Sequence, residues 1–199
     1  MEKKKTRTLY GPTVPCKVGI DYSTTSPAIC IRVRVGLSSF GLSREEWDIH
    51  YLTTTKKLIK EINVDQFRFI GSYLPSDFDH RIERYSHISK WAIDTLELYT
   101  VEKVYLEDYA YAATGRVFHI GENTGLLKYK LMSRDILCET IAPTAVKKEA
   151  TGKGNASKHN MIDKFKQETN IDLYEELGCT TDSPVSDIVD SYFICNHSK

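Results

Sequence analysis

Two aspartates lie one helical turn apart near the end of the sequence, in the segment TDSPVSDIVDSYFIC (residues 181–195). This segment predicts an amphipathic helix, because Ser183 is a favourable N-cap and Pro184 a favourable first helical residue, and because apolar residues then recur at helical spacing. Asp187 and Asp190 fall beside that apolar stripe, where two like charges repel each other. They are either solvated aspartates on an exposed face or members of a larger acidic site.

Two further carboxylates are predicted to lie at the ends of strands. Asp21 follows the apolar run VGI in the first predicted strand, and Glu107 lies near the end of the strand predicted over 101–109. The crossover rule places the second of these strands beside the first, and the final helix can pack across the sheet that they form. Four acids in one place would repel strongly without cations, so the pattern implies a hard divalent metal. Two Mg²⁺ ions about 3.5–4 Å apart are suited to displacement at a phosphodiester.

The elements that must position these acids follow from the hydrophobic pattern. Strands are predicted over 17–23, 28–35, 47–55 and 101–109, and 138–148 is predicted to be a strand that runs into a turn broken by Pro143. Residues 67–75 are a short extra strand or an insertion, and helices are predicted over 80–100, 122–136, 156–169 and 181–195. A three-stranded meander followed by alternating helices and strands indicates an α/β domain with a mixed sheet. Sites in such sheets lie near the carboxyl ends of adjacent strands.

The sequence also indicates how the chain is divided. No repeat, low-complexity tract or linker separates two domains, so we expect a flexible N-terminal tail over 1–15 and one domain over 16–199, with an insertion near 56–79. A chain of 199 residues with 41% hydrophobic content can bury a full core.

Charge and cysteine content narrow the class of protein further. The net charge is zero, so any basic surface must be local. No apolar run is long enough to span a membrane, and the N-terminal MEKKKTR is not followed by the apolar stretch of a signal peptide. Five cysteines without a CxxC pair are typical of reduced thiols. We therefore expect a cytoplasmic protein, in the host-cell cytoplasm if it is viral.

One segment concentrates positive charge. The stretch from Val146 to Lys166 contains six lysines and only two acidic residues, Glu149 and Asp163, which gives a local net charge of +4. Lysines that neutralise phosphates bind nucleic acid without reading its sequence, and the glycines at 152 and 154 allow a phosphate to approach the backbone. The segment does not have the spacing of a phosphate-binding P-loop. The alternative is a solvated loop and helix.

The order of these features resembles a known group of enzymes. A strand-borne aspartate in GIDYS, a glutamate that ends a later strand and a C-terminal D-x-x-D helix resemble the RNase H-like nucleases. Two further stretches, HIGENTGLLKYKLM and APTAVKKEATGKGNASKHNMI, resemble the RuvC family of Holliday junction resolvases, particularly its shorter phage-type members. The shared order extends from about residue 17 to residue 195. The resemblance implies an RNase H-like α/β fold with a mixed five-stranded sheet flanked by helices.

The resemblance also implies roles for individual residues. The metal ligands and catalytic acids would be Asp21, Glu107, Asp187 and Asp190, holding two Mg²⁺ ions, with Mn²⁺ as an alternative and Lys158 as a further catalytic residue. Lys147 and Lys158 fall on the two lysines of the family's basic segment, and within this order of features the segment, with Lys148 and Lys153, is expected to bind the DNA backbone. Further candidates for DNA contact are His159, Arg116, Tyr109 and Tyr111. The family commonly has an aromatic residue three positions after the catalytic glutamate, and Ala110 replaces it here. The two tyrosines are as compatible with packing in the core or at an interface as with stacking on DNA.

The implied partners are branched DNA and a second copy of the chain. A four-way junction presents two symmetric strands, which suits a C₂ dimer. The helix predicted over 122–136, with Leu126, Leu127 and Leu131, would contribute to the interface. No membrane and no small-molecule cofactor are expected.

Three functions are compatible with this pattern. The first is a metal-dependent endonuclease that resolves four-way DNA junctions by paired symmetric nicks and leaves 5′-phosphates. The second is a nuclease of the same fold that also cuts flaps and forks. The third is a catalytically silent junction-binding protein, although a pure binding protein would gain only repulsion from four clustered acids.

Overall fold

The computed structural model describes residues 15–36, 43–108 and 117–197. The strands are β1 (Cys16–Asp21), β2 (Ala28–Gly36), β3 (Ser43–Thr53), β4 (Glu61–Val64), β5 (Phe67–Tyr73), β6 (Val101–Glu107) and β7 (Leu137–Ile141). The helices are α1 (Arg81–Leu96), α2 (Val117–Met132), α3 (Pro143–Thr151), α4 (Lys158–Thr169), α5 (Leu173–Leu177) and α6 (Asp182–His197), with a 3₁₀ turn at Lys56–Leu58. The predicted N-terminal tail lies outside the described residues except for Pro15.

The described strands form one mixed sheet in the order β4-β5-β3-β2-β1-β6-β7. The meander β1-β2-β3 is antiparallel, as expected, while β6 pairs in parallel with β1 and β7 pairs in parallel with β6. The five strands from β3 to the β7 edge, β3-β2-β1-β6-β7, correspond to the predicted five-stranded sheet. Within the described residues the sheet has seven strands, so the expected count of five was wrong.

The two additional strands come from the segment expected to be an insertion. β5 pairs in parallel with β3, and β4 pairs with β5 in an antiparallel hairpin. Phe67 and Phe69 alternate toward the helical layer and are buried, so the insertion extends the hydrophobic core and therefore continues the sheet. Ile62 and Val64 of β4 pack against the same cluster.

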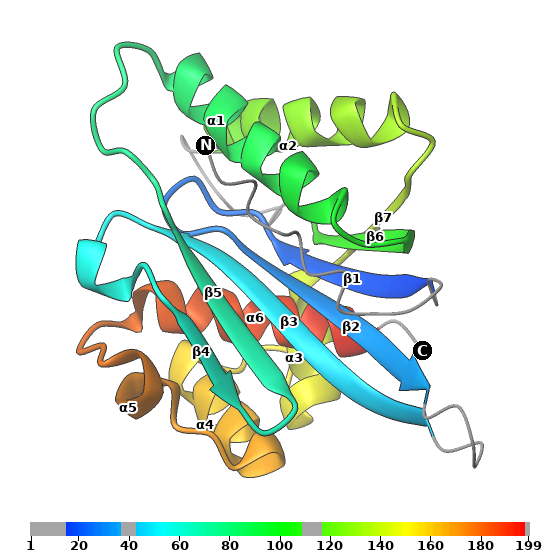
Figure 1. Cartoon of the computed structure of the whole chain (residues 1–199), viewed down its shortest axis with the longest axis vertical. Helices are drawn as coiled ribbons and strands as arrows, with labels where there is room; N and C mark the ends of the chain where they lie inside the picture. Colours follow the sequence, from blue (N-terminus) through cyan, green and yellow to red (C-terminus); the bar gives the residue numbers. More distant parts are fainter. Residues whose placement is uncertain (1–14, 37–42, 109–116, 198–199) are drawn as a thin grey trace, which may run out of the picture.

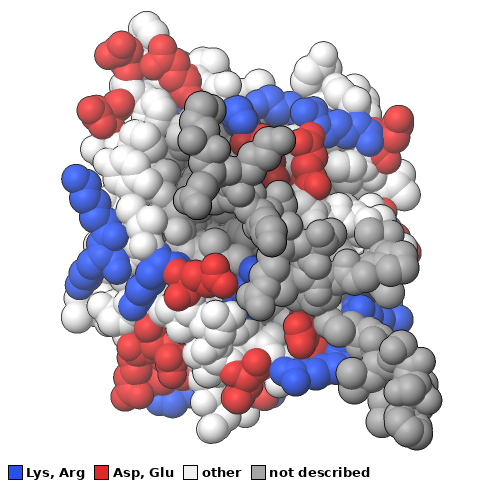
Figure 2. Space-filling model, viewed as in Figure 1, with Lys and Arg blue, Asp and Glu red and all other residues white. Residues whose placement is uncertain are grey.

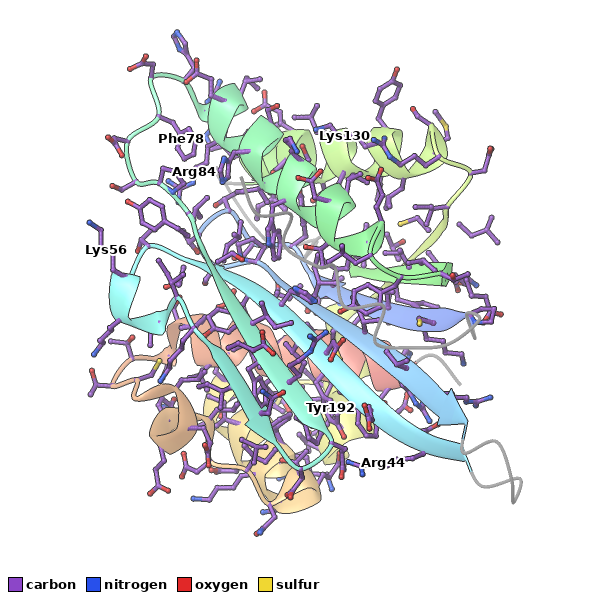
Figure 3. The ribbon with its side chains drawn as sticks, viewed as in Figure 1. Arg44, Lys56, Phe78, Arg84, Lys130 and Tyr192 are labelled. Carbon is purple, nitrogen blue, oxygen red and sulfur yellow. The ribbon has the colours of Figure 1, made fainter. Side chains whose placement is uncertain are left out.

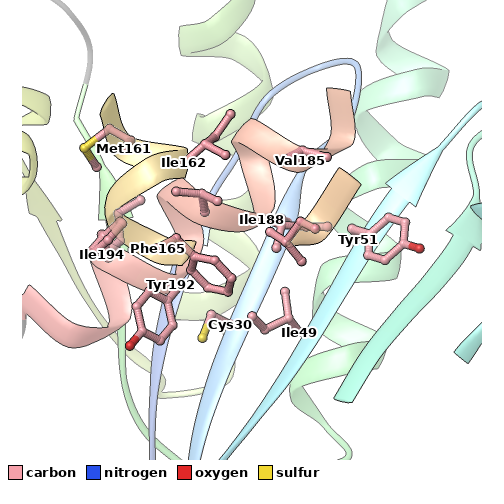
Figure 4. Close-up of a cluster of buried hydrophobic side chains, with 14 of the residues drawn as sticks. Cys30, Ile49, Tyr51, Met161, Ile162, Phe165, Val185, Ile188, Tyr192 and Ile194 are labelled. Atoms are coloured by element: carbon pink, nitrogen blue, oxygen red, sulfur yellow. The ribbon is translucent and has the colours of Figure 1, made fainter. Parts of the chain in front are cut away.

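Helices cover both faces of this sheet, with α1 and α2 on one side and α3, α4, α5 and α6 on the other (Figure 1). The alternation of side chains along each strand supplies the two layers. On β1, Val18 and Ile20 point into the cluster under α1 and α2, whereas Cys30 of the neighbouring β2 belongs to the cluster under α6. Figure 4 shows the α6 cluster, in which side chains of α4 and α6 meet those of β2 and β3.

Gly19 allows α6 to pack closely on β1. A Cβ atom at this position would lie 2.2 Å from the backbone nitrogen of Cys195 and 2.5 Å from the carbonyl oxygen of Ser191. No larger residue fits without moving the helix backbone, so the glycine determines how close α6 lies to the strand that ends at Asp21. The acidic residues of α6 are thereby brought near the end of β1.

The segment after β6 differs from its prediction in two places. In the segment 138–148 the predicted strand ends at Ile141, but helix α3 begins at Pro143 where a turn was expected. Proline fits the first turn of a helix, where its missing N–H costs no hydrogen bond, so Pro143 begins a helix and Lys147 and Lys148 are helical. Helix α2 also lies earlier in the chain than the predicted 122–136.

Helix α4 starts with a complete capping box. The Ser157 hydroxyl accepts a hydrogen bond from the Asn160 backbone N–H, and the Asn160 side chain accepts one from the Ser157 backbone N–H. This cap sets the position of Lys158, the first residue of the helix. Across the described ranges, the helices all lack the combination of length and apolar character that crossing a bilayer requires.

Candidate active site

The two strand-borne acids lie at the same edge of the sheet. Asp21 is the last residue of β1 and Glu107 the last residue of β6. These strands are parallel neighbours, with Ile20 paired to Leu106 in the register, so the two carboxylates follow adjacent positions. Because parallel strands end at the same side of a sheet, both acids lie where α/β folds place their sites.

Helix α6 brings the second pair of acids to this edge. The helix packs on β1, and Asp187 and Asp190 lie one turn apart near its middle. Asp187 is only 9% exposed. The alternative that Asp187 is a solvated aspartate on an exposed face is therefore wrong. Asp187 is buried near the ends of β1 and β6, where Asp21 and Glu107 lie.

The electrostatics show that the four acids interact. Burial raises the pKa of Asp21 well above its usual range, and the charges of Asp187, Glu107 and Asp190 raise it further. Burial, followed by repulsion from Asp190, raises the pKa of Glu107 to about 7. Burial, followed by repulsion from Asp187, raises the pKa of Asp190 to about 6. Without a cation, this group resists carrying its full negative charge.

Two lysines of the basic segment face these acids. The positive charge of Lys158 opposes the rise in pKa of all four carboxyl groups, and its Nζ donates to Ser186 Oγ at 3.4 Å. Lys147 of α3 acts in the same way on Glu107 and Asp190. The structure thus brings together the four predicted acids and these two predicted lysines.

The remaining residues implied as DNA contacts are placed differently. Lys148, Lys153 and His159 are exposed, and Lys153 lines a surface cavity of about 410 Å³ along α3 and α4. Tyr109, Tyr111 and Arg116 lie outside the described residues. In the view of Figure 2, lysines and arginines are interspersed with acidic residues, as expected for a chain without net charge.

The sequence did not point to a group of serines around Asp187. Ser26 Oγ donates to Asp187 Oδ2 at 2.7 Å, and Ser186 Oγ lies 3.4 Å from the same oxygen. The pKa of Asp187 is raised by burial, while the hydrogen bonds from Ser26 and Ser23 and the charge of Lys158 oppose that rise. The segment YSTTS directly after Asp21 carries Ser23 and Ser26, but it suggests only a turn.

The donor set suits a hard divalent cation. Carboxylate oxygens are the ligands that Mg²⁺ prefers, and a bound cation would relieve the repulsion that raises these pKa values. As the side chains are oriented, the described part of the chain contains no group of three or more histidine, cysteine or acidic side chains that is ready to hold an ion. The residues therefore fit a metal by the chemistry of their carboxylates and by the mutual repulsion that a cation would relieve.

The interface predicted on the helix after β6 needs correction. Leu127 and Leu131 are fully buried within this protomer, in the cluster that α2 forms with α1 and the sheet. Their stripe faces the protein's own core, so the prediction that they contact a partner was wrong. Leu126 is partly exposed. The exposed apolar side chains of α2 include Phe118 and Tyr129, which are 75% and 64% exposed.

The sheet order, the parallel β1–β6 pair and the helices on both faces define an RNase H-like α/β fold. No family model matches the chain, and no curated protein matches it. Among solved structures, the chain is similar to RuvC from Thermus thermophilus, with a TM-score of 0.57, 15% identity and 92% of each chain covered. It is also similar to T. thermophilus RuvC in complex with a Holliday junction substrate, with a TM-score of 0.55, 16% identity and the same coverage. The chain has the RuvC fold, which confirms at the level of the fold the resemblance found in the sequence.

Proposed function

We propose that this protein is a metal-dependent endonuclease that resolves four-way DNA junctions by paired symmetric nicks and leaves 5′-phosphates. The observation that carries the proposal is the meeting of Asp21, Glu107, Asp187 and Asp190 at one edge of the sheet, opposite two lysines. The RuvC fold supports it, since one of the similar RuvC structures contains a Holliday junction.

Each of these side chains has a distinct task in the proposal. The four acids would hold two Mg²⁺ ions, which when bound activate water and stabilise the departing 3′ oxygen. Lys158 and Lys147, which already offset the charge of the acids, would bind the phosphate that enters the site. Lys148, Lys153 and His159 are exposed and available to the DNA backbone on either side.

The proposed assembly is a homodimer, because a junction presents two equivalent strands and a C₂ pair offers two sites. Exposed apolar residues at the end of α2 and the start of β7 provide a candidate surface for the partner. Met132 and Leu137 are 67% and 66% exposed and line a cavity of about 660 Å³ beside Ile136 and Cys138. This surface replaces the buried leucines as the proposed contact.

The five cysteines all lie in the described part of the chain, and none of them is in a disulfide. This supports a reducing compartment, and we propose the cytoplasm. The second candidate function, a nuclease that also cuts flaps and forks, rests on the same acids. A silent binding protein remains the third alternative. Burial and mutual repulsion raise the pKa values of Glu107 and Asp190, and a protein that only binds DNA would gain nothing in return for this unfavourable arrangement.

Incubation with labelled four-way, flap, fork and duplex DNA tests the proposal. We expect cleavage of the four-way junction with Mg²⁺, none with EDTA, and little cleavage of the duplex. Equal cutting of flaps and forks would support the second candidate instead. Binding of the junction without cleavage in Mg²⁺ or Mn²⁺ would overturn both nuclease proposals.

A further inference from the structure

A chain of serine hydroxyls leads to Asp187 from the turn between β1 and β2. Ser183 Oγ donates to Ser26 Oγ at 2.7 Å, and Ser26 Oγ donates to Asp187 Oδ2 at 2.7 Å. A hydroxyl has one proton to donate, so the hydrogen bond received from Ser183 leaves the proton of Ser26 directed at the carboxylate. Ser26 is 3% exposed, which keeps water from competing for these contacts.

The turn that carries Ser26 is itself held at two points. The Ser26 backbone N–H donates to Ser23 Oγ at 3.0 Å. From the other face of the sheet, Arg84 Nε donates to the carbonyl oxygen of Thr24 at 2.8 Å. Figure 3 shows Arg84 at the start of α1 near Phe78, over whose ring its guanidinium lies at 5.9 Å. The turn therefore presents the Ser26 hydroxyl from a fixed backbone.

We propose that Ser26 is a positioning residue that fixes the orientation of Asp187 in the metal site, through the hydrogen bond to Oδ2. The inference rests on the proposed function, because Asp187 must be a metal ligand for its orientation to matter. A hydrogen bond from a hydroxyl to a carboxylate is charge-assisted and short, and it reduces the number of rotamers that the carboxylate visits. Residues that orient a metal ligand in this way typically change metal affinity by about 10–100-fold when they are removed.

Three substitutions test this role. Ser26→Ala removes the donor, and Ser26→Thr keeps a hydroxyl at the same position. Ser89→Ala is the matched control, because Ser89 is also buried but lies on α1, where its hydroxyl donates to the Ser86 carbonyl and accepts from Lys130 Nζ. Mg²⁺ binding would be measured by isothermal titration calorimetry without DNA, and junction cleavage would be measured as a function of Mg²⁺ concentration.

We expect Ser26→Ala to raise the Kd for Mg²⁺ by about 10–100-fold and to raise the half-saturating Mg²⁺ for cleavage similarly, with most of kcat recovered at high Mg²⁺. Ser26→Thr and Ser89→Ala should bind Mg²⁺ like the wild type. If Ser26→Ala does not fold, Ser183→Ala is the substitute test. It removes the hydroxyl that donates to Ser26 and should also raise the Kd for Mg²⁺, by a smaller factor.

The outcomes separate this inference from the function on which it rests. Unchanged Mg²⁺ affinity in Ser26→Ala, with an active wild type, overturns the positioning role alone. A wild type that binds Mg²⁺ but cuts no branched DNA overturns the proposed function, while the affinities of the variants still test Ser26. Equal loss of affinity in Ser26→Ala and Ser89→Ala would show a general effect of burial and would overturn the specific role.

Discussion

Glu107 should destabilise the metal-free protein at neutral and higher pH. Its pKa is about 7 in the folded protein, against an ordinary value of 4.5, because of burial and repulsion from the acids of α6. Between these two values the folded state keeps a proton that the unfolded chain has released, so stability falls as the pH rises through this window. The difference corresponds to about 3 kcal/mol lost between roughly pH 4 and pH 8.

Replacing the carboxyl group by an amide removes this cost. In EDTA at pH 8, Glu107→Gln should be more stable than the wild type by up to about 3 kcal/mol, equivalent to roughly 6–12 °C in Tm for a chain of this size. At pH 5 the wild-type side chain is largely protonated, so the two proteins should melt at similar temperatures. Thermal melts followed by circular dichroism at both pH values measure the difference.

The same strand provides a control. Glu102 also lies on β6 but is exposed, so Glu102→Gln should change the Tm little at either pH. Saturating Mg²⁺ should raise the Tm of the wild type more than that of Glu107→Gln, since a ligand selective for the native state stabilises it. A variant that is less stable than the wild type at pH 8, or that gains equally at pH 5, would refute the reasoning.

The other predictions concern the acids, the lysines and the packing of α6. Asp21→Asn and Asp190→Asn should each abolish junction cleavage while junction binding in a gel-shift assay is retained; near-normal cleavage would remove that residue from the proposed ligands. Lys147→Ala and Lys158→Ala should each reduce the slope of log affinity against log salt by about one, if each contacts one phosphate; an unchanged slope with lost cleavage would instead place the lysine at the scissile phosphate. Gly19→Ala should destabilise the fold by at least about 1–3 kcal/mol, because its Cβ would lie 2.2 Å from the backbone nitrogen of Cys195; an unchanged Tm would show that α6 moves away at little cost.

The proximity of the four acids could be predicted from the sequence because each is marked by a local pattern. Asp21 and Glu107 end apolar runs that form neighbouring parallel strands, and Asp187 and Asp190 have the spacing of one helical turn. The order of strands and helices supplied the rest, since the crossover rule limits where the second strand can pair. The same reasoning did not find the partner of β5, which pairs with β3 across an insertion.

Features that depend on distant contacts could not be predicted. Ser26 and Asp187 are 161 positions apart, and no local pattern distinguishes a turn serine that donates to a carboxylate from one that faces water. The direction of an apolar stripe is equally ambiguous. Leu127 and Leu131 have the spacing of an interface helix, but that spacing equally suits a helix that covers its own sheet, as α2 does.

The most direct test of the central claim uses a supercoiled plasmid that extrudes a cruciform, because the product reports how the two strands are cut. Paired nicks across the four-way junction convert the plasmid to linear DNA, whereas independent nicks leave relaxed circles. We predict linear product from the wild type with Mg²⁺, with ends that carry 5′-phosphates, and none with EDTA or with Asp187→Asn. Relaxed circles as the only wild-type product, or linear product from Asp187→Asn, would contradict the account.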